Sequence, residues 1–438
     1  MSDRKLEIEL RAALSLRPYP HNARVHSKKQ IRQIARSIEQ FGFTNPILID
    51  DQSMVLAGHG RLSAAKHLEM KEVPCVVLSN MSGAQKRAYI LADNKLVLNG
   101  AWDEEILATE LQSLLLEDSK FDLDLTGFAI PEIDRIIEGL NPSDRGDPAD
   151  ERIPAVGDVS VSKPGDLWIL GPHKILCGSA LDEAAFQRLM GREKAEMVFT
   201  DPPYNVPIDG HVGGLGKVRH REFAMASGEM SKPEFTDFLG TVMRHLARFS
   251  TEGSIHFHCM DWRHLAEMLA AGDGIYTELK NICVWVKENG GMGTFYRSRH
   301  ELVCVFKSGA KPHINNFELG QHGRYRTNVW EYRGYSPAAK SSDDNFAIHP
   351  TVKPVQMVSD AIKDVSKRGG IVLDCFGGSG TTVIAAHKTG RRARLVEIDP
   401  LYVDVVIRRW QDYAKDDAVL ESTGETFDEV ARSRSVRL

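Results

Sequence analysis

The sequence predicts an α/β fold built on an open sheet, preceded by a separate α+β domain. Two segments indicate the open sheet. The apolar, β-prone run 195–200 leads directly into Asp201-Pro202-Pro203-Tyr204, called here the Asp201–Tyr204 motif, and the strand-like run 371–375 leads into a glycine-rich loop and an Ala-rich helix over 383–388. Ligands bind open α/β sheets where such strands end and loops begin. Both segments are therefore candidate parts of a functional site.

The first hundred residues are predicted to form the α+β domain. Ser27 can cap a helix whose apolar residues recur at helical spacing, and Gly42 suits the C-terminal end of that helix. Two short strands over 46–57 lead into Gly58-His59-Gly60-Arg61 and a helix over 62–68. A glycine turn that opens a helix, with an Arg in its first turn, suits a nucleotide or phosphate group. The alternative is a tight turn in which Arg61 pairs with a neighbouring acid.

Three further segments complete the domain organisation. Residues 101–139 are predicted to form acidic helices, and the turn formers of 140–157 predict a linker. We therefore expect a first domain over 1–139, a second domain over 158–415, and a C-terminal tail with little periodicity over 416–438. An apolar stripe on the acidic helices suits a docking surface or a dimer contact better than catalysis, and consists of Ile106, Leu107, Leu111, Leu114 and Leu115.

Composition limits the classes of protein that fit. The chain has 438 residues, 42% of them hydrophobic, which suffices for two or three domains with cores of their own. Its six cysteines form no Cys-x-x-Cys pair, so we expect buried thiols and no metal site. No apolar run reaches membrane-spanning length, and the N-terminus lacks the apolar core of a signal peptide. We therefore expect a cytoplasmic protein.

The distribution of charge restricts where a nucleic acid could bind. The formal net charge is -5. Residues 102–150 contain fourteen acidic and three basic side chains, whereas 17–36 contain six basic side chains and no acid. A phosphate-binding surface must therefore be a local patch.

The Asp201–Tyr204 motif combines the groups that a planar amine needs. The two prolines fix φ and lack an N–H, which leaves a stiff turn with carbonyls free to accept hydrogen bonds. Asp201 and one such carbonyl can accept both protons of an exocyclic NH2 group, which directs the nitrogen lone pair at an electrophile. Tyr204 offers a face on which a base can stack, worth about 1–3 kcal/mol. The alternative is an ordinary turn at a strand end with a buried Tyr.

The glycine loop, defined as residues 376–381, suits a cofactor. It follows a strand and opens a helix, so its backbone N–H groups can approach a ligand closely. A second strand, 393–397, ends in Glu397 about 20 residues after the loop, the separation at which an acid meets ribose hydroxyls in a βαβ unit. This pattern alone also fits NAD. A P-loop is excluded because no Gly-Lys-Ser/Thr follows the glycines.

Together the two motifs resemble those of the amino-methyltransferases that use S-adenosylmethionine to methylate adenine N6 or cytosine N4 in DNA. The resemblance covers roughly residues 160–412, and the catalytic motif precedes the cofactor loop, as in the permuted β-type subgroup. It implies a Rossmann-like class I methyltransferase domain. Two positions depart from the pattern, namely Cys375, where relatives often carry Pro, and Gly178-Ser179, where many have Gly-Asp. Shorter matches are Gly165-Asp166-Leu167-Trp168, Trp285-Val286-Lys287, Arg297-Ser298-Arg299-His300-Glu301 and Thr327-Asn328-Val329-Trp330.

The resemblance implies roles for individual residues. The implied catalytic residues are Asp201, Pro202, Pro203 and Tyr204. The implied cofactor-binding residues, which include a segment over 349–354 that closes over the methionine end of the cofactor, are His349, Thr351, Lys353, Asp374, Phe376, Gly377, Gly378, Ser379, Gly380, Thr381 and Glu397.

Residues 8–100 resemble the ParB-like nuclease and sulfiredoxin superfamily, whose partition members bind CTP at a loop of the Gly58–Arg61 kind. The loop here has one Arg and one His where partition proteins usually place two arginines. Asp93-Asn94-Lys95 is weakly similar to their downstream Glu-Asn motif. No Cys stands in the loop, which argues against sulfiredoxin chemistry.

Two segments that interleave basic and aromatic residues, 206–230 and 311–340, suit phosphate contact and base stacking. The family match adds a third, the loop that contains Arg297 and Arg299. The alternative for each segment is a solvated charged surface. The candidate DNA-binding residues are Lys217, Arg219, Arg221, Arg297, Arg299, Arg324, Arg326 and Trp330.

The sequence thus predicts a site-specific DNA methyltransferase, of the kind found in restriction-modification systems, that transfers a methyl group from S-adenosylmethionine to N6 of a flipped adenine. In the resembling family an Asp at the first motif position favours adenine, and cytosine N4 is the alternative. Two further alternatives are a ParB-like nucleotide-dependent DNA-binding protein and a glutamine methyltransferase, whose related motif begins with Asn. The expected partner is DNA. Homodimer formation and a partner restriction endonuclease are left open.

Overall fold

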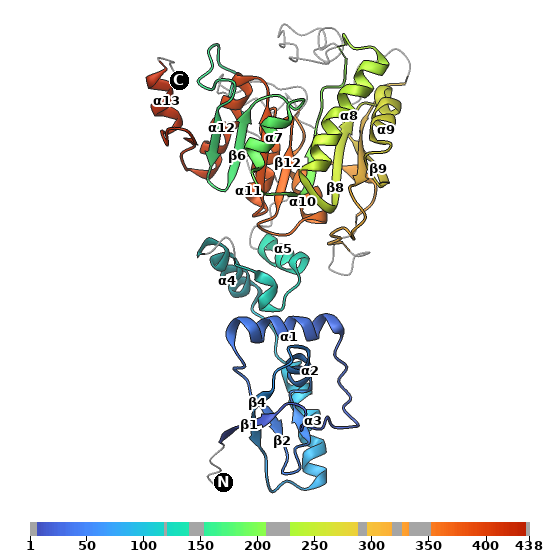
Figure 1. Cartoon of the computed structure of the whole chain (residues 1–438), viewed down its shortest axis with the longest axis vertical. Coiled ribbons are helices and arrows are strands. Elements are labelled where there is room, and N and C mark those ends of the chain that lie inside the picture. The colour runs from blue at the N-terminus through green and yellow to red at the C-terminus, as the bar shows by residue number, and fades with distance from the viewer. Residues whose placement is uncertain are drawn as a thin grey trace. The chain divides into compact units, whose positions relative to one another are not determined.

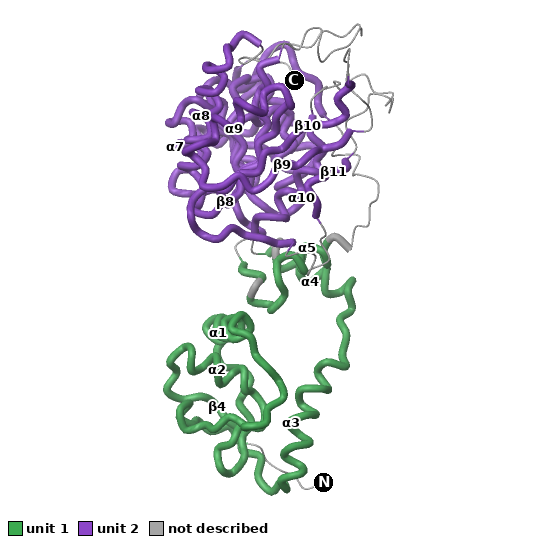
Figure 2. The backbone as a smooth tube through the Cα atoms, turned by 90° about the vertical axis from the view of Figure 1, so that its right-hand side faces the viewer, with its two compact units in different colours: residues 1–141 green, residues 142–438 purple. Residues whose placement is uncertain are grey.

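The chain forms two compact units, residues 1–141 and 142–438 (Figures 1 and 2). This computed structural model describes residues 7–117, 121–139, 153–206, 228–287, 296–317, 326–332 and 352–434. Within these residues no helix has both the length and the apolar character needed to cross a membrane.

Unit 1 begins with the predicted α+β domain. Its four-stranded sheet has the order β1 (Ile8–Ala12), β4 (Glu72–Val77), β2 (Ile47–Ile49) and β3 (Val55–Ala57). Side chains from β2, β3 and β4 form its core together with Ala13, Leu16 and residues of the following helix α2.

The first helix, α1 (Lys28–Phe41), forms where the sequence predicts it. The Ser27 hydroxyl accepts from the Gln30 N–H at 3.1 Å, and Gly42 ends the helix at φ 79°, a conformation that favours glycine. Helix α2 (His59–His67) begins three residues earlier than expected. Its N-cap is Gly58 at φ 97°, so the Gly58–Arg61 loop belongs largely to the first turn of the helix.

Unit 1 continues with α3 (Gly83–Val97), α4 (Glu104–Glu117), the short helix η1 (Leu123–Thr126) and α5 (Ile130–Gly139). The acidic helices have a small core of their own, made by Ala108, Leu111, Leu123, Ile133 and Ile136. The predicted apolar stripe is therefore divided. Leu111 is buried in this core, whereas Ile106 is 63% exposed.

Unit 2 is built on a ten-stranded sheet whose five central strands are parallel. Antiparallel strands extend it on both sides, and β11 pairs in parallel with β9 at one edge. In spatial order the strands are β11 (Val329–Glu331), β9 (Glu278–Val286), β10 (His300–Lys307), β8 (Ser250–Met260), β7 (Ala195–Thr200), β12 (Ile371–Asp374), β13 (Arg392–Glu397), β6 (His173–Cys177), β5 (Leu167–Leu170) and β14 (Val419–Leu420).

Two hydrophobic cores cover the two faces of this sheet, which makes the unit a three-layer α/β/α structure (Figure 1). One core contains side chains of α7 (Glu183–Met190), α8 (Lys232–Arg248) and α9 (Leu265–Gly272), which follows the short helix η2 (Trp262–His264). The other contains side chains of α10 (Val355–Val365), α11 (Thr381–Lys388) and α12 (Pro400–Ala414). In β7 the alternation is direct, because Met197 and Phe199 enter one core and Val198 the other.

The strand order of the sheet reverses between β7 and β12. From β7 it passes through α8 to β8 on one side, and from β12 it passes through α11 to β13 on the other. The carboxyl ends of two adjacent parallel strands that diverge in this way form a crevice, which is where open α/β sheets bind ligands. The Asp201–Tyr204 motif and the glycine loop follow these two strands.

The C-terminal segment differs from the predicted tail. Strand β14 pairs with β5, and α13 (Phe427–Ser433) buries Phe427 against Trp168, with ring centroids 5.4 Å apart. Arg434 anchors the end of the helix through an ion pair with Asp166 at 2.6 Å. The signal was present in the sequence, because Thr426 and Glu429 form a capping box and apolar residues follow at helical spacing. The helix is too short for periodicity alone to reveal it.

Candidate active site

Strands β7 and β12 bring the two sequence motifs together. Thr200, the last residue of β7, donates its hydroxyl to the Asp374 carboxylate at 2.9 Å, and Asp374 is the last residue of β12. The Asp201–Tyr204 motif and the glycine loop thus start from neighbouring, hydrogen-bonded positions at the same edge of the sheet.

The Asp201 carboxylate lies in a network of four charged groups. Its Oδ1 accepts from the Tyr204 hydroxyl at 2.6 Å, and its Oδ2 accepts from Nζ of Lys353 at 2.5 Å. Glu301 Oε2 lies 3.1 Å from the same ammonium and 3.2 Å from the Tyr204 hydroxyl. Lys287 pairs with Oε1 of Glu301. Two carboxylates and two ammonium groups therefore compensate one another around the Tyr204 ring.

Burial and charge act in opposite directions on these groups. Burial raises the pKa of Asp201, against the nearby charge of Lys353. Burial alone would lower the pKa of Lys353, but Asp201 and Glu301 outweigh it and hold that pKa well above the ordinary value. Burial alone would raise the pKa of Glu301, but Lys353 and Lys287 lower it to about 2. Lys353 and Glu301 are therefore an ionised pair at neutral pH.

A side chain after the motif closes the base of the following loop. Asn205 adopts φ 53°, and its amide oxygen accepts from the backbone N–H of Gly228 at 3.1 Å and of Met230 at 3.2 Å. Its amide nitrogen donates to the Met230 carbonyl at 2.8 Å. The two ends of the segment between Val206 and Gly228 are thereby clasped together, a feature called here the Asn205 clasp.

The glycine loop has the close packing of a cofactor cradle. Gly378 and Gly380 have φ values of 48° and 83°, which favour glycine. A Cβ on Gly377 would lie 3.3 Å from Leu395, and one on Gly380 would lie 3.2 Å from Val406. A side chain at either position would crowd the strand or helix beneath the loop.

Carboxylates hold this loop in place from below. Glu397, at the end of β13, accepts from the N–H of Gly378 at 2.8 Å and of Asp399 at 2.9 Å. Asp374 accepts from Thr382 at 2.6 Å and from the N–H of Phe376 at 3.1 Å. Burial raises the pKa of Asp374 to about 7, although these hydrogen bonds oppose the shift.

Further contacts connect the loop to its surroundings. The Arg409 guanidinium donates to the Ser379 carbonyl at 3.0 Å. The Thr381 hydroxyl donates to the backbone carbonyl of Lys353 at 3.3 Å, which joins the loop to the segment before α10. Lys353 itself points to Asp201, whereas His349 and Thr351 lie outside the described residues.

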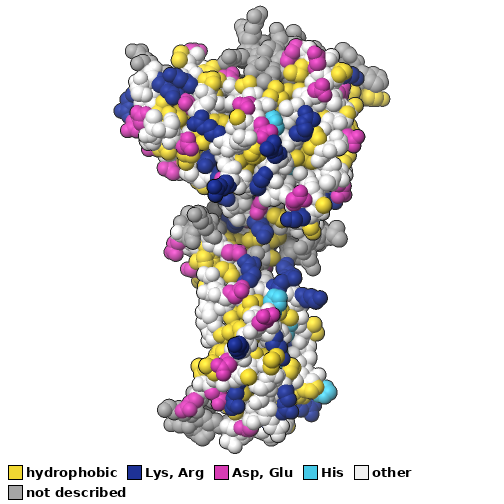
Figure 3. All heavy atoms as spheres, in the orientation of Figure 1, with side chains coloured by type: hydrophobic (Ala, Val, Ile, Leu, Met, Phe, Trp, Pro, Cys, Tyr) yellow, Lys and Arg dark blue, Asp and Glu magenta, His cyan; other side chains and the backbone are white. Residues whose placement is uncertain are grey.

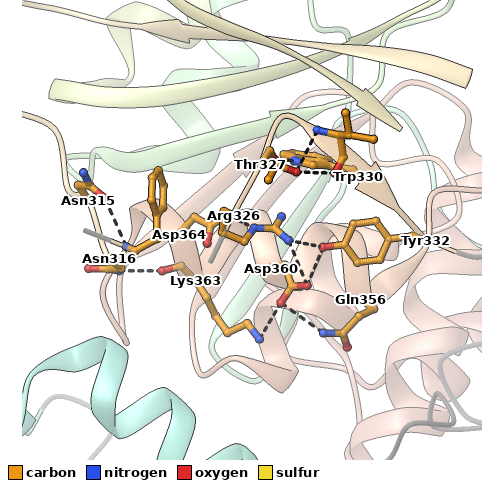
Figure 4. A network of polar contacts seen from close by, with 12 residues as sticks. Asn315, Asn316, Arg326, Thr327, Trp330, Tyr332, Gln356, Asp360, Lys363 and Asp364 are labelled. Carbon is orange, nitrogen blue, oxygen red and sulfur yellow. Dashed lines mark hydrogen bonds and ion pairs between the residues drawn. The ribbon is translucent and has the colours of Figure 1, made fainter. Parts of the chain in front are cut away.

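The candidate DNA-binding residues have different surroundings. Lys217, Arg219, Arg221 and Arg324 lie outside the described residues. Arg297 and Arg299 are exposed, as a DNA contact requires. Arg326 and Trp330 instead make contacts with other residues of unit 2 (Figure 4).

Arg326 belongs to an internal network. It donates to Asp364 at 3.0 Å and to the Tyr332 hydroxyl at 2.7 Å, and the same hydroxyl donates to Asp360 at 2.7 Å (Figure 4). Trp330 is 4% exposed and donates its indole N–H to the Thr327 carbonyl at 3.1 Å. The expectation of base stacking by Trp330 is therefore wrong for this structure, because β11 pairing with β9 buries the indole. Of the described residues in this segment, Arg326, Trp330 and Tyr332 make contacts within unit 2.

Charge on the surface is mixed. On the face of unit 2 that Figure 3 shows, Lys and Arg side chains are interspersed with Asp and Glu. A phosphate-binding surface on this face is therefore restricted to local groups. In the described part of the chain, no cluster of three or more His, Cys, Asp or Glu side chains is arranged to hold a metal ion.

The Gly58–Arg61 loop of unit 1 is held by local hydrogen bonds. Nε2 of His59 accepts from the Tyr19 N–H at 3.2 Å, and Arg61 donates to the Pro46 carbonyl at 3.3 Å. A Cβ on Gly60 would approach Ile34 to 3.0 Å, so this glycine permits α1 and α2 to pack closely. Burial lowers the pKa of Arg61, and the charge of Asp93 opposes the shift.

No motif in the sequence gives Glu301 or Lys287 a role beside Asp201. Both lie in short segments that match the resemblance, which is the signal that could have identified them. The contact itself depends on the pairing of β10 with β9, a long-range feature that no local pattern contains.

Comparison with known families assigns three segments of the chain. Residues 195–408 match a family model described as DNA methylase (N6_N4_Mtase), and residues 7–95 match one described as ParB N-terminal domain. Residues 105–164 match a model described as ParB-methyltransferase HTH domain, which the sequence analysis did not anticipate.

Individual relatives match one unit or the other. The ParB-like nuclease domain-containing protein YnaK of Escherichia coli K12 is 51% identical over 83 residues, which are 19% of this chain and 95% of that protein. The DNA adenine methyltransferase YhdJ of the same organism is 24% identical over 260 residues, covering 54% of this chain and 81% of YhdJ. The crystal structure of TTHA0409 from Thermus thermophilus, complexed with S-adenosyl-L-methionine, matches with a TM-score of 0.38 at 19% identity, over 55% of this chain and 93% of that chain.

Proposed function

We propose that this chain methylates the N6 amine of adenine at a specific site in DNA. The chain belongs to the ParB-like family through its N-terminal domain and to the N6/N4 DNA methylase family through residues 195–408. S-adenosylmethionine is the methyl donor of the methylase family. The observation that carries the proposal is the adjacency of the Asp201–Tyr204 motif and the glycine loop, joined by the Thr200–Asp374 hydrogen bond.

The residues around the glycine loop fit this cofactor. Gly377 and Gly380 let the loop pack directly on β13 and α12, and Glu397 offers a carboxylate beside the loop for ribose hydroxyls. When bound, S-adenosylmethionine supplies an electrophilic methyl group. Lys353 joins the cradle to the amine pocket, because its carbonyl accepts from Thr381 and its ammonium contacts Asp201.

The Asp201–Tyr204 motif receives the target amine. An amine inside a duplex cannot meet the methyl group in line, so the base must leave the stack at a cost of about a few kcal/mol. Asp201 and the Pro202 carbonyl accept the two N–H groups of the amine, and Tyr204 stacks on the flipped base. The main contribution of the protein is position and electrostatics, because neither a covalent intermediate nor a metal is needed for this transfer.

Two observations support adenine as the base. In the resembling family an Asp at the position of Asp201 accompanies adenine N6 specificity, and cytosine N4 enzymes more often carry Ser. The relative YhdJ is named a DNA adenine methyltransferase. Cytosine N4 is the alternative within the same family.

The test is to identify the methylated nucleoside and its sequence context. Unmethylated DNA is incubated with the full chain and isotope-labelled S-adenosylmethionine, and the nucleosides are separated by mass spectrometry. We expect labelled N6-methyladenine, confined by methylation-sensitive sequencing to one short sequence. Labelled N4-methylcytosine in place of N6-methyladenine would show that cytosine is the target base. The absence of label in either base would overturn the proposal.

A further inference from the structure

Glu301 lies beside the Asp201–Tyr204 motif although it belongs to neither motif. It comes from β10, and its side chain is 14% exposed beside that of Lys353, which is 6% exposed. Its Oε2 faces both groups that hydrogen-bond to Asp201, the Lys353 ammonium at 3.1 Å and the Tyr204 hydroxyl at 3.2 Å. Asp201 and Glu301 therefore share the same two donors.

This sharing matters because both oxygens of Asp201 already accept a hydrogen bond. Oδ1 accepts from Tyr204 at 2.6 Å and Oδ2 from Lys353 at 2.5 Å. A charge-assisted bond from an ammonium is roughly twice as strong as a neutral one. Each oxygen has a second lone pair, but a neutral amine competes poorly with Lys353 for the lone pair that the ammonium occupies.

Glu301 offers the displaced ammonium an alternative partner without a loss of charge pairing. The Lys353 contact to Glu301 already exists and needs only to shorten, so the buried cation never lacks a carboxylate. Lys287 occupies the other oxygen of Glu301 and lies 4.7 Å from the centre of the Trp285 ring, which fixes the side of Glu301 that faces Lys353. Such an exchange avoids the large cost of leaving a buried charge unpaired.

We propose that Glu301 is a positioning residue that takes over the Lys353 ammonium and the Tyr204 hydroxyl when the target amine reaches Asp201. The Asp201 carboxylate is then free to accept the amine N–H. This inference rests on the proposed methyl transfer and adds two residues to it, Glu301 as the receiving carboxylate and Lys353 as the group that moves between carboxylates.

The experiment compares Glu301→Gln, Lys353→Gln and Lys353→Arg with the wild-type chain, with Glu278→Gln as control. Glu278 is an exposed Glu paired with Lys280 on the neighbouring strand β9. For each protein we would measure kcat and KM for DNA across pH, and the affinity for S-adenosylmethionine by calorimetry. For Glu301→Gln we expect kcat to fall roughly 100-fold, the loss that a small misplacement of the reacting groups can cause. Cofactor affinity should stay within about twofold, and Lys353→Arg should recover part of the activity lost in Lys353→Gln.

The pH profile separates this role from a merely structural one. The charged and titratable groups that face Asp201 are Tyr204 in its own motif, Lys353 before α10, Glu301 on β10, Cys259 on β8 and Asp374 on β12. Removing the Glu301 charge should lower the pKa of Asp201 and move the acidic limb of kcat to lower pH. Removing the Lys353 charge should move that limb to higher pH. A loss of packing would not shift the two limbs in opposite directions.

Several outcomes would overturn the inference. A Glu301→Gln variant that retains wild-type kcat and pH profile would show that Glu301 has no part in positioning. Limbs that shift in the same direction in Glu301→Gln and Lys353→Gln would do the same. If Glu301→Gln does not fold, the double variant Glu301→Gln/Lys287→Gln, which restores charge balance, takes its place with the same expected loss of kcat. A wild-type chain that transfers no methyl group in this assay would overturn the proposed function, and this inference with it.

Discussion

Asp201 has a different partner for each carboxylate oxygen, and this makes its removal a specific test. In Asp201→Ala, Lys353 keeps its contact with Glu301, so no buried charge is left alone. We therefore expect cofactor affinity near the wild-type value and methyl transfer below about one-hundredth of the wild-type rate. Calorimetry with S-adenosylmethionine and a labelled-methyl assay measure the two quantities. Asp201→Asn, which keeps one acceptor oxygen, is the matched control and should retain more activity than Asp201→Ala.

Glu397 combines a structural contact with a proposed ligand contact. Its oxygens hold the N–H groups of Gly378 and Asp399, and the ribose hydroxyls would be further donors. Glu397→Ala should weaken S-adenosylmethionine binding by about 1.5–3 kcal/mol, or roughly 10- to 100-fold. Unchanged affinity in calorimetry would remove Glu397 from the cofactor site. Glu397→Gln retains one acceptor and should show a smaller loss.

Asp374 makes stability depend on pH. Its folded pKa of about 7 exceeds the ordinary value of 3.8, so the folded chain binds more protons than the unfolded chain between these values. The contribution of Asp374 to the free energy of unfolding is therefore present at low pH and is lost as pH rises from about 4 to 7. Asp374→Asn should flatten this part of the curve. Urea unfolding at a series of pH values measures it, with the exposed Asp428→Asn as control, and parallel curves for wild type and Asp374→Asn would contradict the assignment.

At the scale of the element, the last helix is predicted to be essential for the stability of unit 2. Phe427 is 1% exposed and packs on Trp168 in the core of the sheet. Phe427→Ala should cost about 3–5 kcal/mol of unfolding free energy. Asp428→Ala, at the neighbouring exposed position of the same helix, should cost far less. Equal midpoints for the two variants in urea would show that α13 does not support the core.

Local signals predicted the elements that contain their own stop and start residues. Ser27 and Gly42 defined α1, whereas α11 begins at Thr381, two residues before the predicted start of this helix. Elements that depend on long-range pairing were harder to predict. Two-residue β14 forms because β5 offers it an edge, and Arg326 is half-buried because it pairs with Asp360 and Asp364 of α10. Local sequence does not identify Glu301 for the same reason, because only the packed sheet brings β10 close to Asp201.

At the scale of the whole molecule, the position of the active site in unit 2 predicts a division of labour. A fragment over residues 142–438 should bind S-adenosylmethionine and methylate the same sequence as the full chain, because all described residues of the proposed amine and cofactor sites lie within it. Sequencing of DNA modified by each protein tests this. A folded fragment that binds the cofactor yet modifies another sequence, or none at low salt, would show that unit 1 helps to read the site.

A longer fragment, over residues 97–438, is the matched comparison because it restores the segment that matches the HTH model. Both fragments lack α1, where Lys28, Lys29 and Arg32 are exposed and Arg36 pairs with Asp122, just before η1. If the exposed side chains contact phosphates, their loss should weaken binding alike on all DNA sequences and flatten the dependence on salt. Nitrocellulose filter binding at several salt concentrations measures this slope. Equal slopes for the full chain and both fragments would exclude α1 from DNA contact.

The Asn205 clasp affects how the chain between its two ends can vary among related proteins. The chain leaves the Asp201–Tyr204 motif and returns toward α8 through one closed neck, held by Gly228 and Met230. The entropic cost of a loop grows only slowly with its length, so insertions between the ends of such a neck add little to the cost of folding. Selection can therefore exchange or lengthen this insert while the neck keeps the Asp201–Tyr204 motif in place. The Asp201–Tyr204 motif and the chain between the two ends of the clasp are therefore free to vary independently.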